Sequence, residues 1–197
     1  MQIGIISDTH DNWPTLDRVC AYLTDNQIST LIHCGDMCAP LTLGRLLQGY
    51  GGEVHTVLGN VDGDPFLMAT RFGRDNLHQH GAERAELELG GRNIAVQHYP
   101  GLARGLASSG AYDAVFYGHD HTLHQERFHV DERAGTDRAS TDLTSADHKS
   151  AGREVILANP GTLSAMGKAQ TFLIYDTASN ELTAIEVAYE SVVTIAT

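Results

Sequence analysis

Histidine and acidic side chains recur directly after short apolar runs in this sequence. One such run, residues 114–117, is followed by His119 and His121, two imidazoles one residue apart. If the backbone stays extended there, both side chains point to the same side of the chain. Two neutral imidazoles on one side can form part of a metal site, but a pair alone cannot complete one. The remaining ligands must therefore come from elsewhere in the chain.

Four earlier apolar runs end in the same way. Each is followed within a few residues by a carboxylate, an amide or an imidazole: Asp8 with His10, then Asp36, then Asn60, then His98. Ligands of open α/β sheets gather at the carboxyl ends of the strands, so we expect these side chains to meet. Seven nitrogen and oxygen donors suit two metal ions that share a carboxylate, and Asp36 is the candidate for the shared one.

The donor types limit which metals are expected. Imidazole, carboxylate and amide groups without a thiolate favour first-row transition metals over a soft-metal site. We therefore expect two divalent transition-metal ions, Mn²⁺, Ni²⁺, Co²⁺, Zn²⁺ or Fe. The donor types do not distinguish among these metals, and Mn²⁺ is our first expectation. Gly35, Gly59 and Gly118 each directly precede a candidate ligand, which predicts tight turns where the backbone approaches metal or substrate closely.

The elements that must position these residues alternate between strand and helix in the first part of the chain. Helix signals follow the first two apolar runs: Asn12 as a cap with Pro14 in the first turn, and then leucines from Leu41 to Leu47. The order βαβαβ predicts an α/β fold with a mostly parallel sheet covered by helices. Further expected elements are a hairpin at 85–97, a short helix at 102–109, a strand at 155–158 and a terminal hairpin at 172–187.

Composition restricts the class of protein and of partner. With 25 Asp and Glu against 13 Lys and Arg, the formal net charge is −12, which argues against a broad nucleic-acid-binding surface and would suit a high-salt cytoplasm. The three cysteines are too few for a disulfide framework, and no segment reaches about 18 uninterrupted apolar residues. We therefore expect a cytoplasmic protein without a membrane span. At this length we expect one domain over 1–197, with a mobile insertion at 131–152, where small polar residues dominate.

Taken in order, the ligand blocks resemble those of the calcineurin-like metallophosphoesterases, in particular the small YfcE-type phosphodiesterases. The blocks are Asp8-Thr9-His10, Gly35-Asp36, Gly59-Asn60, His98 and the stretch 118–121, followed by Asn159-Pro160-Gly161. As an ordered set they are a specific signal, whereas any one of them is weak. The resemblance implies a four-layer α-β-β-α sandwich in which helices flank two mixed sheets.

The resemblance also implies a role for each candidate ligand. Two ions would share the seven residues: Asp8, His10 and His121 on one, Asn60, His98 and His119 on the other, and Asp36 between them. The implied reaction is hydrolysis of a small phosphodiester by in-line attack of a hydroxide that bridges the two metals. Asp36 and Asn60 would then be catalytic as well as metal-binding, with Asn60 steadying a phosphate oxygen.

Three positions depart from the family pattern. Val61 stands where many relatives have a histidine thought to protonate the leaving group, so Asp62 is the remaining candidate acid, and good leaving groups are expected to be favoured. Tyr99 stands where glycine is common after the histidine ligand. Asp120 lies between the two paired histidines and, by alternation, is expected to point away from the metals.

Two other functions stay open at this point. The fold implied also occurs in a retromer subunit, a non-catalytic protein-binding scaffold with a degraded metal site, but all seven ligand positions are intact here. Phosphomonoesterase activity is the second alternative. A homodimer could form through an apolar edge strand or the tail 192–195. His33 is expected beneath the site beside Asp36, and Cys34 is expected to pack as a small apolar residue.

Overall fold

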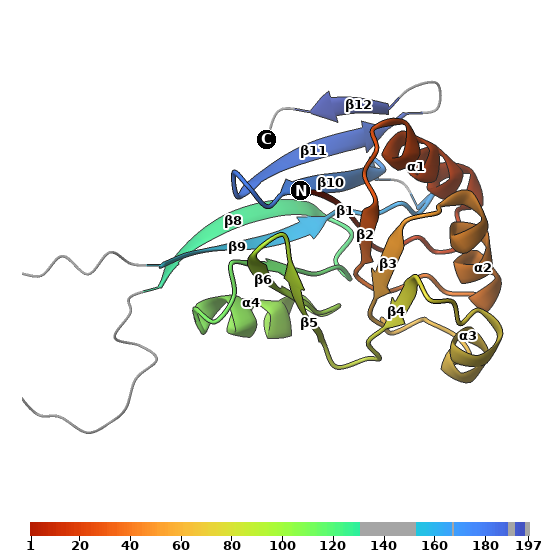
Figure 1. The fold of residues 1–197 in the computed structure, drawn as a ribbon, viewed down its shortest axis with the longest axis horizontal. Helices are drawn as coiled ribbons and strands as arrows, with labels where there is room; N and C mark the ends of the chain where they lie inside the picture. Colours follow the sequence, from red (N-terminus) through yellow and green to blue (C-terminus); the bar gives the residue numbers. More distant parts are fainter. Residues whose placement is uncertain (131–152, 167, 189–191, 196–197) are drawn as a thin grey trace, which may run out of the picture.

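The computed structural model describes residues 1–130, 153–166, 168–188 and 192–195. Two β-sheets lie face to face at its centre, and helices cover the outer face of each sheet (Figure 1). The fold is therefore the four-layer α-β-β-α sandwich that the sequence predicts.

The larger sheet has seven strands in the order β12-β11-β10-β1-β2-β3-β4. Strands β1 to β4 run parallel, which the βαβαβ pattern predicts for the first three of them. Strand β10 pairs with β1 in the antiparallel direction. The pairs β10–β11 and β11–β12 are also antiparallel. The strands are β1 (Gln2–Ile6), β2 (Thr30–His33), β3 (Glu53–Thr56), β4 (Leu77–Gln79), β10 (Thr171–Asp176), β11 (Glu181–Val187) and β12 (Val192–Ile195).

The smaller sheet has five strands in the order β5-β6-β7-β9-β8. Strands β6, β7 and β9 are parallel, and the outer strands β5 and β8 pair with them in the antiparallel direction. The strands are β5 (Ala85–Leu89), β6 (Arg92–Val96), β7 (Ala114–Phe116), β8 (Leu123–Val130) and β9 (Arg153–Pro160).

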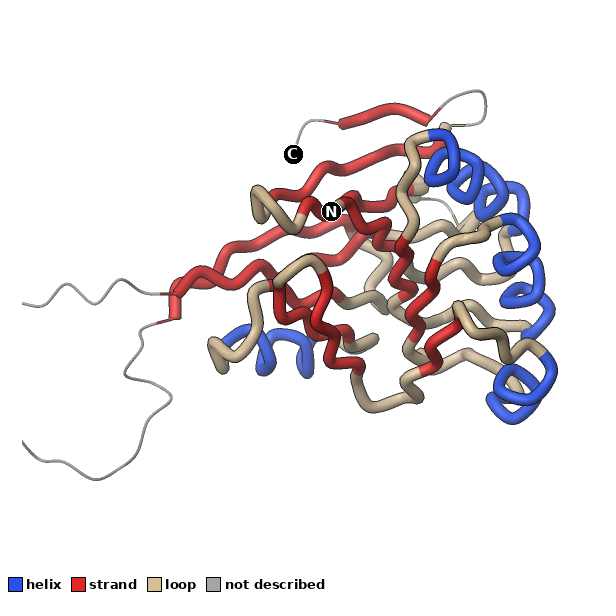
Figure 2. Tube along the Cα trace, in the orientation of Figure 1, coloured by secondary structure: helices blue, strands red, loops and turns tan. Residues whose placement is uncertain are grey.

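The helices follow the strands that carry the candidate ligands. In Figure 2, helices α1, α2 and α3 line the outer flank of the larger sheet, and α4 lies on the other side of the molecule, beside the smaller sheet. Each begins with a proline in its first turn, a position where the missing amide hydrogen costs nothing. The helices are α1 (Trp13–Asp25), α2 (Pro40–Gly49), α3 (Pro65–Arg71) and α4 (Pro100–Ser108).

Three apolar layers hold the sandwich together. Neighbouring residues of one strand belong to different layers, because successive side chains alternate between the two faces of a strand. Leu31 in β2 packs toward helices α1 and α2, whereas Ile32 packs between the two sheets. Val115 in β7 joins a third cluster with Ala103 of α4. Both faces of the central strands are thus covered, which explains their continuous apolar sequences.

Four elements differ from the sequence-based expectation. Helix α3 and strands β4, β8 and β12 were not predicted. Strand β8 is an edge strand whose residues are all partly or fully exposed, so it lacks the apolar alternation that would reveal it. Strand β4 has only three residues. The expected insertion at 131–152 lies outside the described residues.

One helix cap also differs. Asn12 precedes α1, but its side chain makes no capping bond to the helix backbone. Its amide instead donates to Thr15 Oγ1 at 2.9 Å and to the carbonyl of Leu163 at 2.7 Å. Asn12 therefore ties the start of α1 to the loop after β9. None of the helices in the described ranges is long and apolar enough to span a membrane.

Candidate metal centre

The seven candidate ligands lie on the loops that follow five strands, and the structure brings all of them together. Three of these strands, β1, β2 and β3, belong to the larger sheet, and β6 and β7 belong to the smaller one. The site therefore lies at the edge where the carboxyl ends of the parallel strands of both sheets meet, as expected for an α/β fold.

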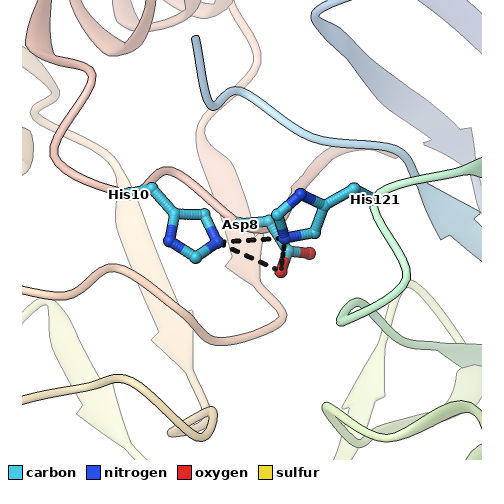
Figure 3. A group of neighbouring side chains, drawn as sticks. All are labelled: Asp8, His10 and His121. Carbon is cyan, nitrogen blue, oxygen red and sulfur yellow. Dashed lines mark hydrogen bonds and ion pairs between the residues drawn. The ribbon is translucent and has the colours of Figure 1, made fainter. Parts of the chain in front are cut away.

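The first group of donors consists of Asp8, His10 and His121 (Figure 3). The Nε2 atoms of His10 and His121 are 3.0 Å apart. Oδ1 of Asp8 lies 3.1 Å from His121 Nε2 and 3.7 Å from His10 Nε2. Asp8 is fully buried, and this burial raises the pKa of its carboxyl, although a hydrogen bond from Ser7 and the nearby imidazoles act in the opposite direction.

The second group consists of Asn60, His98 and His119. Oδ1 of Asn60 lies 3.1 Å from His98 Nε2 and 2.8 Å from His119 Nδ1. The other ring nitrogen of His98, Nδ1, lies 2.8 Å from the carbonyl oxygen of Cys34 and donates its hydrogen to it. That bond fixes the tautomer, so the lone pair of His98 Nε2 faces the other donors.

Asp36 lies between the two groups. Its Oδ2 atom is 3.4 Å from Nε2 of His98 and 3.8 Å from Nε2 of His10, so a single carboxylate oxygen approaches both sets of donors. Burial by itself would raise the pKa of this carboxyl. The hydrogen bond from the amide of Val61, together with His98 and the other nearby imidazoles when they are protonated, outweighs burial and lowers the pKa.

These donors fit a pair of transition-metal ions. Two ligands that each lie about 2.0–2.2 Å from one ion are about 3–4 Å apart. The donor pairs given above are separated by 2.8 to 3.8 Å. In addition, the facing ring nitrogens of His10 and His121 can share at most one hydrogen, so a cation satisfies both better than a hydrogen bond does.

The backbone of the ligand loops is not extended. Ten non-glycine residues of the described chain have a positive φ, and five of them are candidate ligands: Asp8, His10, Asp36, His119 and His121. This left-handed conformation is uncommon for non-glycine residues and costs free energy, and such strain clusters at functional sites. The expectation of an extended segment at 119–121 is therefore wrong, since φ is 78° at His119 and 56° at His121. As a result, His119 contacts Asn60, whereas His121 contacts Asp8.

Two of the glycines that precede ligands are required by close packing. A Cβ atom on Gly59 would overlap the Asp36 carboxylate, and one on Gly118 would overlap the side chain of Ser7 and approach Asp8. The backbone at these positions passes close to the side chains of Asp36, Ser7 and Asp8. Close approach to a metal or a substrate stays a prediction.

Asp62 holds two of the ligand loops in place. Its Oδ2 accepts hydrogen bonds from the amides of Asp36 at 2.9 Å and Gly59 at 2.7 Å, and its Oδ1 accepts one from the amide of Cys38 at 2.8 Å. These three backbone donors orient the carboxylate into the loops and occupy both of its oxygens. The suggestion that Asp62 supplies a proton to the leaving group is therefore not supported by its contacts.

The block at 159–162 braces the other loops. Asn159 is fully buried and donates to the carbonyl of Gly118 at 3.0 Å and to Oδ1 of Asp120 at 2.7 Å. Thr162 donates to the carbonyl of Asp8 at 2.9 Å. Asp120 belongs to neither donor group, which agrees with the expectation that its side chain points away from the metals. Sequence reasoning noticed this block only through the family resemblance and gave it no role.

The histidine and cysteines near the site have structural contacts. His33 is fully buried, accepts a hydrogen bond from the amide of Gly35 at 3.1 Å and donates to Thr9 Oγ1 at 2.6 Å. It supports the loop before Asp36 rather than the carboxylate itself. Burial lowers the pKa of His33 to about 4, so its ring is neutral. Cys34 is fully buried in the core between the sheets, as expected. Cys38 places its sulfur 3.4 Å from Nδ1 of His10, a contact that sequence reasoning missed.

The whole arrangement is that of a known family. A family model described as the calcineurin-like phosphoesterase superfamily domain matches residues 1–180. The chain belongs to the calcineurin-like phosphoesterase superfamily. A curated relative, the phosphodiesterase MJ0936 of Methanocaldococcus jannaschii, is 27% identical over 123 residues, which cover 61% of this chain and 74% of the relative.

Two solved structures have a similar fold. An archaeal phosphodiesterase structure aligns over 95% of this chain and all of its own, with a TM-score of 0.70 and 22% identity. The phosphoesterase Yfce from E. coli aligns over 100% of this chain and 97% of its own, with a TM-score of 0.59 and 18% identity. These likenesses agree with the four-layer sandwich described above.

Proposed function

We propose that this superfamily member is a metal-dependent phosphodiesterase with a dinuclear centre that hydrolyses a small phosphodiester. The observation that carries the proposal is the position of Asp36 Oδ2, within 3.8 Å of a ring nitrogen in each of two donor groups. The name of the curated relative, a phosphodiesterase, supports the same reaction class. The division of ligands is that of the two groups, Asp8 with His10 and His121 on one side, and Asn60 with His98 and His119 on the other.

When bound, a pair of divalent ions supplies a water of lowered pKa for in-line attack on phosphorus and withdraws charge from the phosphoryl oxygens. The chain supplies the geometry. Asp36 holds the two donor groups at a fixed separation. Asn60 uses Oδ1 toward the two histidines of its group, which leaves its amide hydrogens to steady a phosphate oxygen.

Electrostatics brings an anionic diester to this edge of an acidic protein. The charges of two divalent ions and of the Asp8 and Asp36 carboxylates sum to about +2 at the centre. The formal charge of the chain is −12. The centre is therefore a local cationic spot, and the phosphate of a substrate is drawn to it rather than to the surrounding surface.

The loop after Asn60 offers no side chain that is free to donate a proton to the leaving group. The side chain of Val61 cannot donate a proton, and the carboxylate of Asp62 is engaged by three backbone amides. Without a general acid at this position, the leaving alcohol departs without receiving a proton, so substrates with good leaving groups are hydrolysed faster. We expect the rate to fall steeply as the pKa of the leaving alcohol rises.

The test is turnover of a panel of phosphodiesters and phosphomonoesters by metal-stripped protein and by protein reloaded with Mn²⁺, Ni²⁺, Co²⁺ or Zn²⁺. We expect no turnover after stripping and recovery of diesterase activity with at least one metal. Asp36→Asn should abolish that recovery, while Asp64→Asn, which changes a helix cap outside the donor set, should retain it. Full activity after exhaustive chelation would refute the mechanism. Absence of turnover with every metal would favour a protein-binding scaffold instead.

A further inference from the structure

A cluster of three histidines and a glutamate lies at the edge of the larger sheet, outside both donor groups of the candidate metal centre. Strand β3 carries Glu53 and His55, and the edge strand β4 with the residue after it carries His78 and His80. His55 pairs in register with His78, and residues two apart in a strand point to the same side. All four side chains therefore share one face of the sheet, and we call them the histidine edge.

The histidine edge faces the layer between the two sheets. Val54 and Leu77, which precede His55 and His78, pack on the opposite face, against the core beneath the helices. Ile32 pairs in register with His55 and belongs to the apolar layer between the sheets. Because β4 is the last strand of the larger sheet (Figure 1), the three imidazoles at this margin are only partly buried. An ion from solvent can therefore reach their ring nitrogens.

Two ring nitrogens of the histidine edge have the spacing of metal ligands. Nδ1 of His55 lies 3.3 Å from Nε2 of His80. Two ligands of a tetrahedral Zn²⁺ ion, each at about 2.0–2.1 Å, are about 3.3–3.4 Å apart, whereas hydrogen bonds from a nitrogen donor are mostly shorter than about 3.2 Å. The backbone keeps His80 in place, because its amide donates to the carbonyl of Thr56 at 2.9 Å. The spacing therefore fits a shared ion better than a shared hydrogen.

Both of these histidines are in the form that binds a metal. Burial, followed by the charges of the two neighbouring histidines, lowers the pKa of His55 to about 4. Burial, followed by the charge of His78, also lowers the pKa of His80. Metal ions bind the neutral imidazole. At neutral pH an ion therefore does not have to compete with a second proton on either ring.

Glu53 prepares His78 to act as the third ligand. Nε2 of His78 donates its hydrogen to Oε2 of Glu53 at 2.8 Å, so the lone pair of Nδ1 is available, and a carboxylate behind a histidine is common at metal sites. The rings of His55 and His78 are stacked at a centroid distance of 4.6 Å, so His78 must turn to aim Nδ1 at an ion held by the other two histidines. The side chain of His78 is 42% exposed and that of Glu53 is 52% exposed, which leaves room for this rotation.

We propose that the histidine edge binds one Zn²⁺ ion through His55, His78 and His80, and that this ion fastens β4 to β3. Imidazole ligands suit Zn²⁺, whereas Mn²⁺ prefers carboxylate, carbonyl and water oxygens. The histidine edge therefore takes zinc and leaves manganese to the candidate metal centre. Strand β4 has only three residues, and a structural ion adds free energy to folding where backbone pairing is this short. The ion also stabilises β3, the strand whose following loop carries Asn60.

The experiment compares the zinc content of metal-stripped full-length proteins after dialysis against buffered free Zn²⁺ at neutral pH. The double variant His55→Gln, His80→Gln is expected to hold one zinc ion fewer per chain than the unmodified protein. After dialysis against Mn²⁺ instead, the two proteins should hold equal amounts of metal. Glu53→Gln keeps all three imidazoles and should weaken binding of the additional zinc ion by about tenfold, the low end of the effect of such partners.

His129→Ala is the matched control, because it removes an imidazole from an exposed position on β8, outside the histidine edge. It should leave the zinc content unchanged. The difference of one zinc ion should persist when Asp36→Asn is added to both proteins, which separates the histidine edge from the dinuclear centre. Equal zinc content in the unmodified protein and the double variant would overturn the inference. It would leave the diesterase proposal standing, which fails only if no metal supports turnover.

Discussion

At the scale of single residues, the two donor groups differ in how their histidines are held. Nδ1 of His98 meets a backbone carbonyl at 2.8 Å, whereas Nδ1 of His10 meets the sulfur of Cys38 at 3.4 Å. A thiol is a weaker hydrogen-bond acceptor than a carbonyl. Partners of this kind orient a metal-binding histidine and raise its basicity. The ion held by His10 is therefore expected to bind less tightly than the other one.

Replacement of Cys38 tests this difference. Cys38→Ala should weaken the binding of one ion by about tenfold, because the loss of such a partner typically costs 10–100-fold and this contact is a weak one. Cys38→Ser keeps a hydrogen-bonding group and should retain most of the affinity. Burial, with nearby carboxylates, raises the pKa of the Cys38 thiol to about 12, so the thiol is protonated before metal is added. Calorimetric titration with Mn²⁺ measures both affinities, and equal affinities in Cys38→Ala and the unmodified protein would contradict the prediction.

The paired histidines should separate the two ions. His121 contacts Asp8 and His10, whereas His119 contacts Asn60. His121→Ala is expected to weaken one ion by more than about a hundredfold and leave the other nearly intact, and His119→Ala should do the reverse. Metal content after dialysis at graded free Mn²⁺ concentrations gives the two affinities. His129→Ala, at an exposed position on β8, serves as the control. Equal loss of both ions in either variant would count against the division.

At the scale of elements, the loops after β2 and β3 depend on one carboxylate. The carboxylate of Asp62 accepts hydrogen bonds from the backbone amides of Asp36, Cys38 and Gly59. Asp62→Asn replaces one accepting oxygen by a donor that faces backbone N–H groups, so we expect a loss of about 1–3 kcal/mol in the free energy of unfolding. Denaturant unfolding of the metal-free protein measures it. Asp64→Asn is the control, since asparagine caps a helix as well as aspartate does. Equal stability of the two variants would contradict the role given to Asp62.

The edge of the larger sheet gives the protein a pH-dependent stability. The ring of His55 on β3 stacks on His78 and contacts His80 at 3.3 Å, and Glu53 is bonded to His78. Burial, followed by the charges of the two neighbouring histidines, lowers the pKa of His55 to about 4. The folded imidazole therefore stays neutral where the unfolded one, with a pKa of about 6.5, has already bound a proton.

Stability from this source is complete above about pH 6.5 and is lost as the pH falls toward 4. Because His55 is only partly buried, we expect a loss of about 1–2 kcal/mol over this range. His55→Gln should flatten the pH dependence between these limits by that amount. Denaturant unfolding of both proteins at several pH values supplies the comparison, and parallel curves would refute the assignment.

The candidate site was more predictable from the sequence than its geometry was. The structure brings together the seven side chains that the sequence singles out, and each was found because it follows a short, continuous apolar run. The left-handed backbone at His119 and His121 was not foreseen, because histidine adopts this conformation in only a minority of cases. That conformation depends on distant atoms: Asn159, far along the chain, holds the carbonyl of Gly118 and the carboxylate of Asp120. Contacts of this range leave no local pattern.

Elements at the margins of the sheets were the least predictable. Strand β8 pairs with β9 over eight residues but has charged and polar side chains on both faces. Backbone hydrogen bonds to the buried strand β9 determine the position of β8, whereas burial of its own side chains contributes little. Helix α3 has one buried residue, Met68, and therefore no apolar stripe. The parts of the fold that contribute little to the core thus escape detection by hydrophobic pattern.

At the scale of the whole molecule, the formal charge of −12 opposes the compact state. Screening shortens the range of this repulsion from about 10 Å at 0.1 M salt to about 3 Å at 1 M. We expect the unfolding temperature to rise by several degrees between these KCl concentrations, because repulsion among surface carboxylates is weakened. Calorimetry of the metal-free protein measures the change. Indifference to molar KCl would exclude adaptation to a high-salt interior.

The place of β1 in the larger sheet has a consequence for how the protein is made. Strand β1 pairs on one side with β2, but its other neighbour is β10, where Ile3 pairs with Tyr175. The carbonyl of Asp8 is likewise held by Thr162. A ribosome adds about 5–20 residues per second, so the first ligand loop leaves it many seconds before these partners exist. Metal loading is therefore expected to follow release of the finished chain, and a nascent chain stalled before β10 should bind no metal pair.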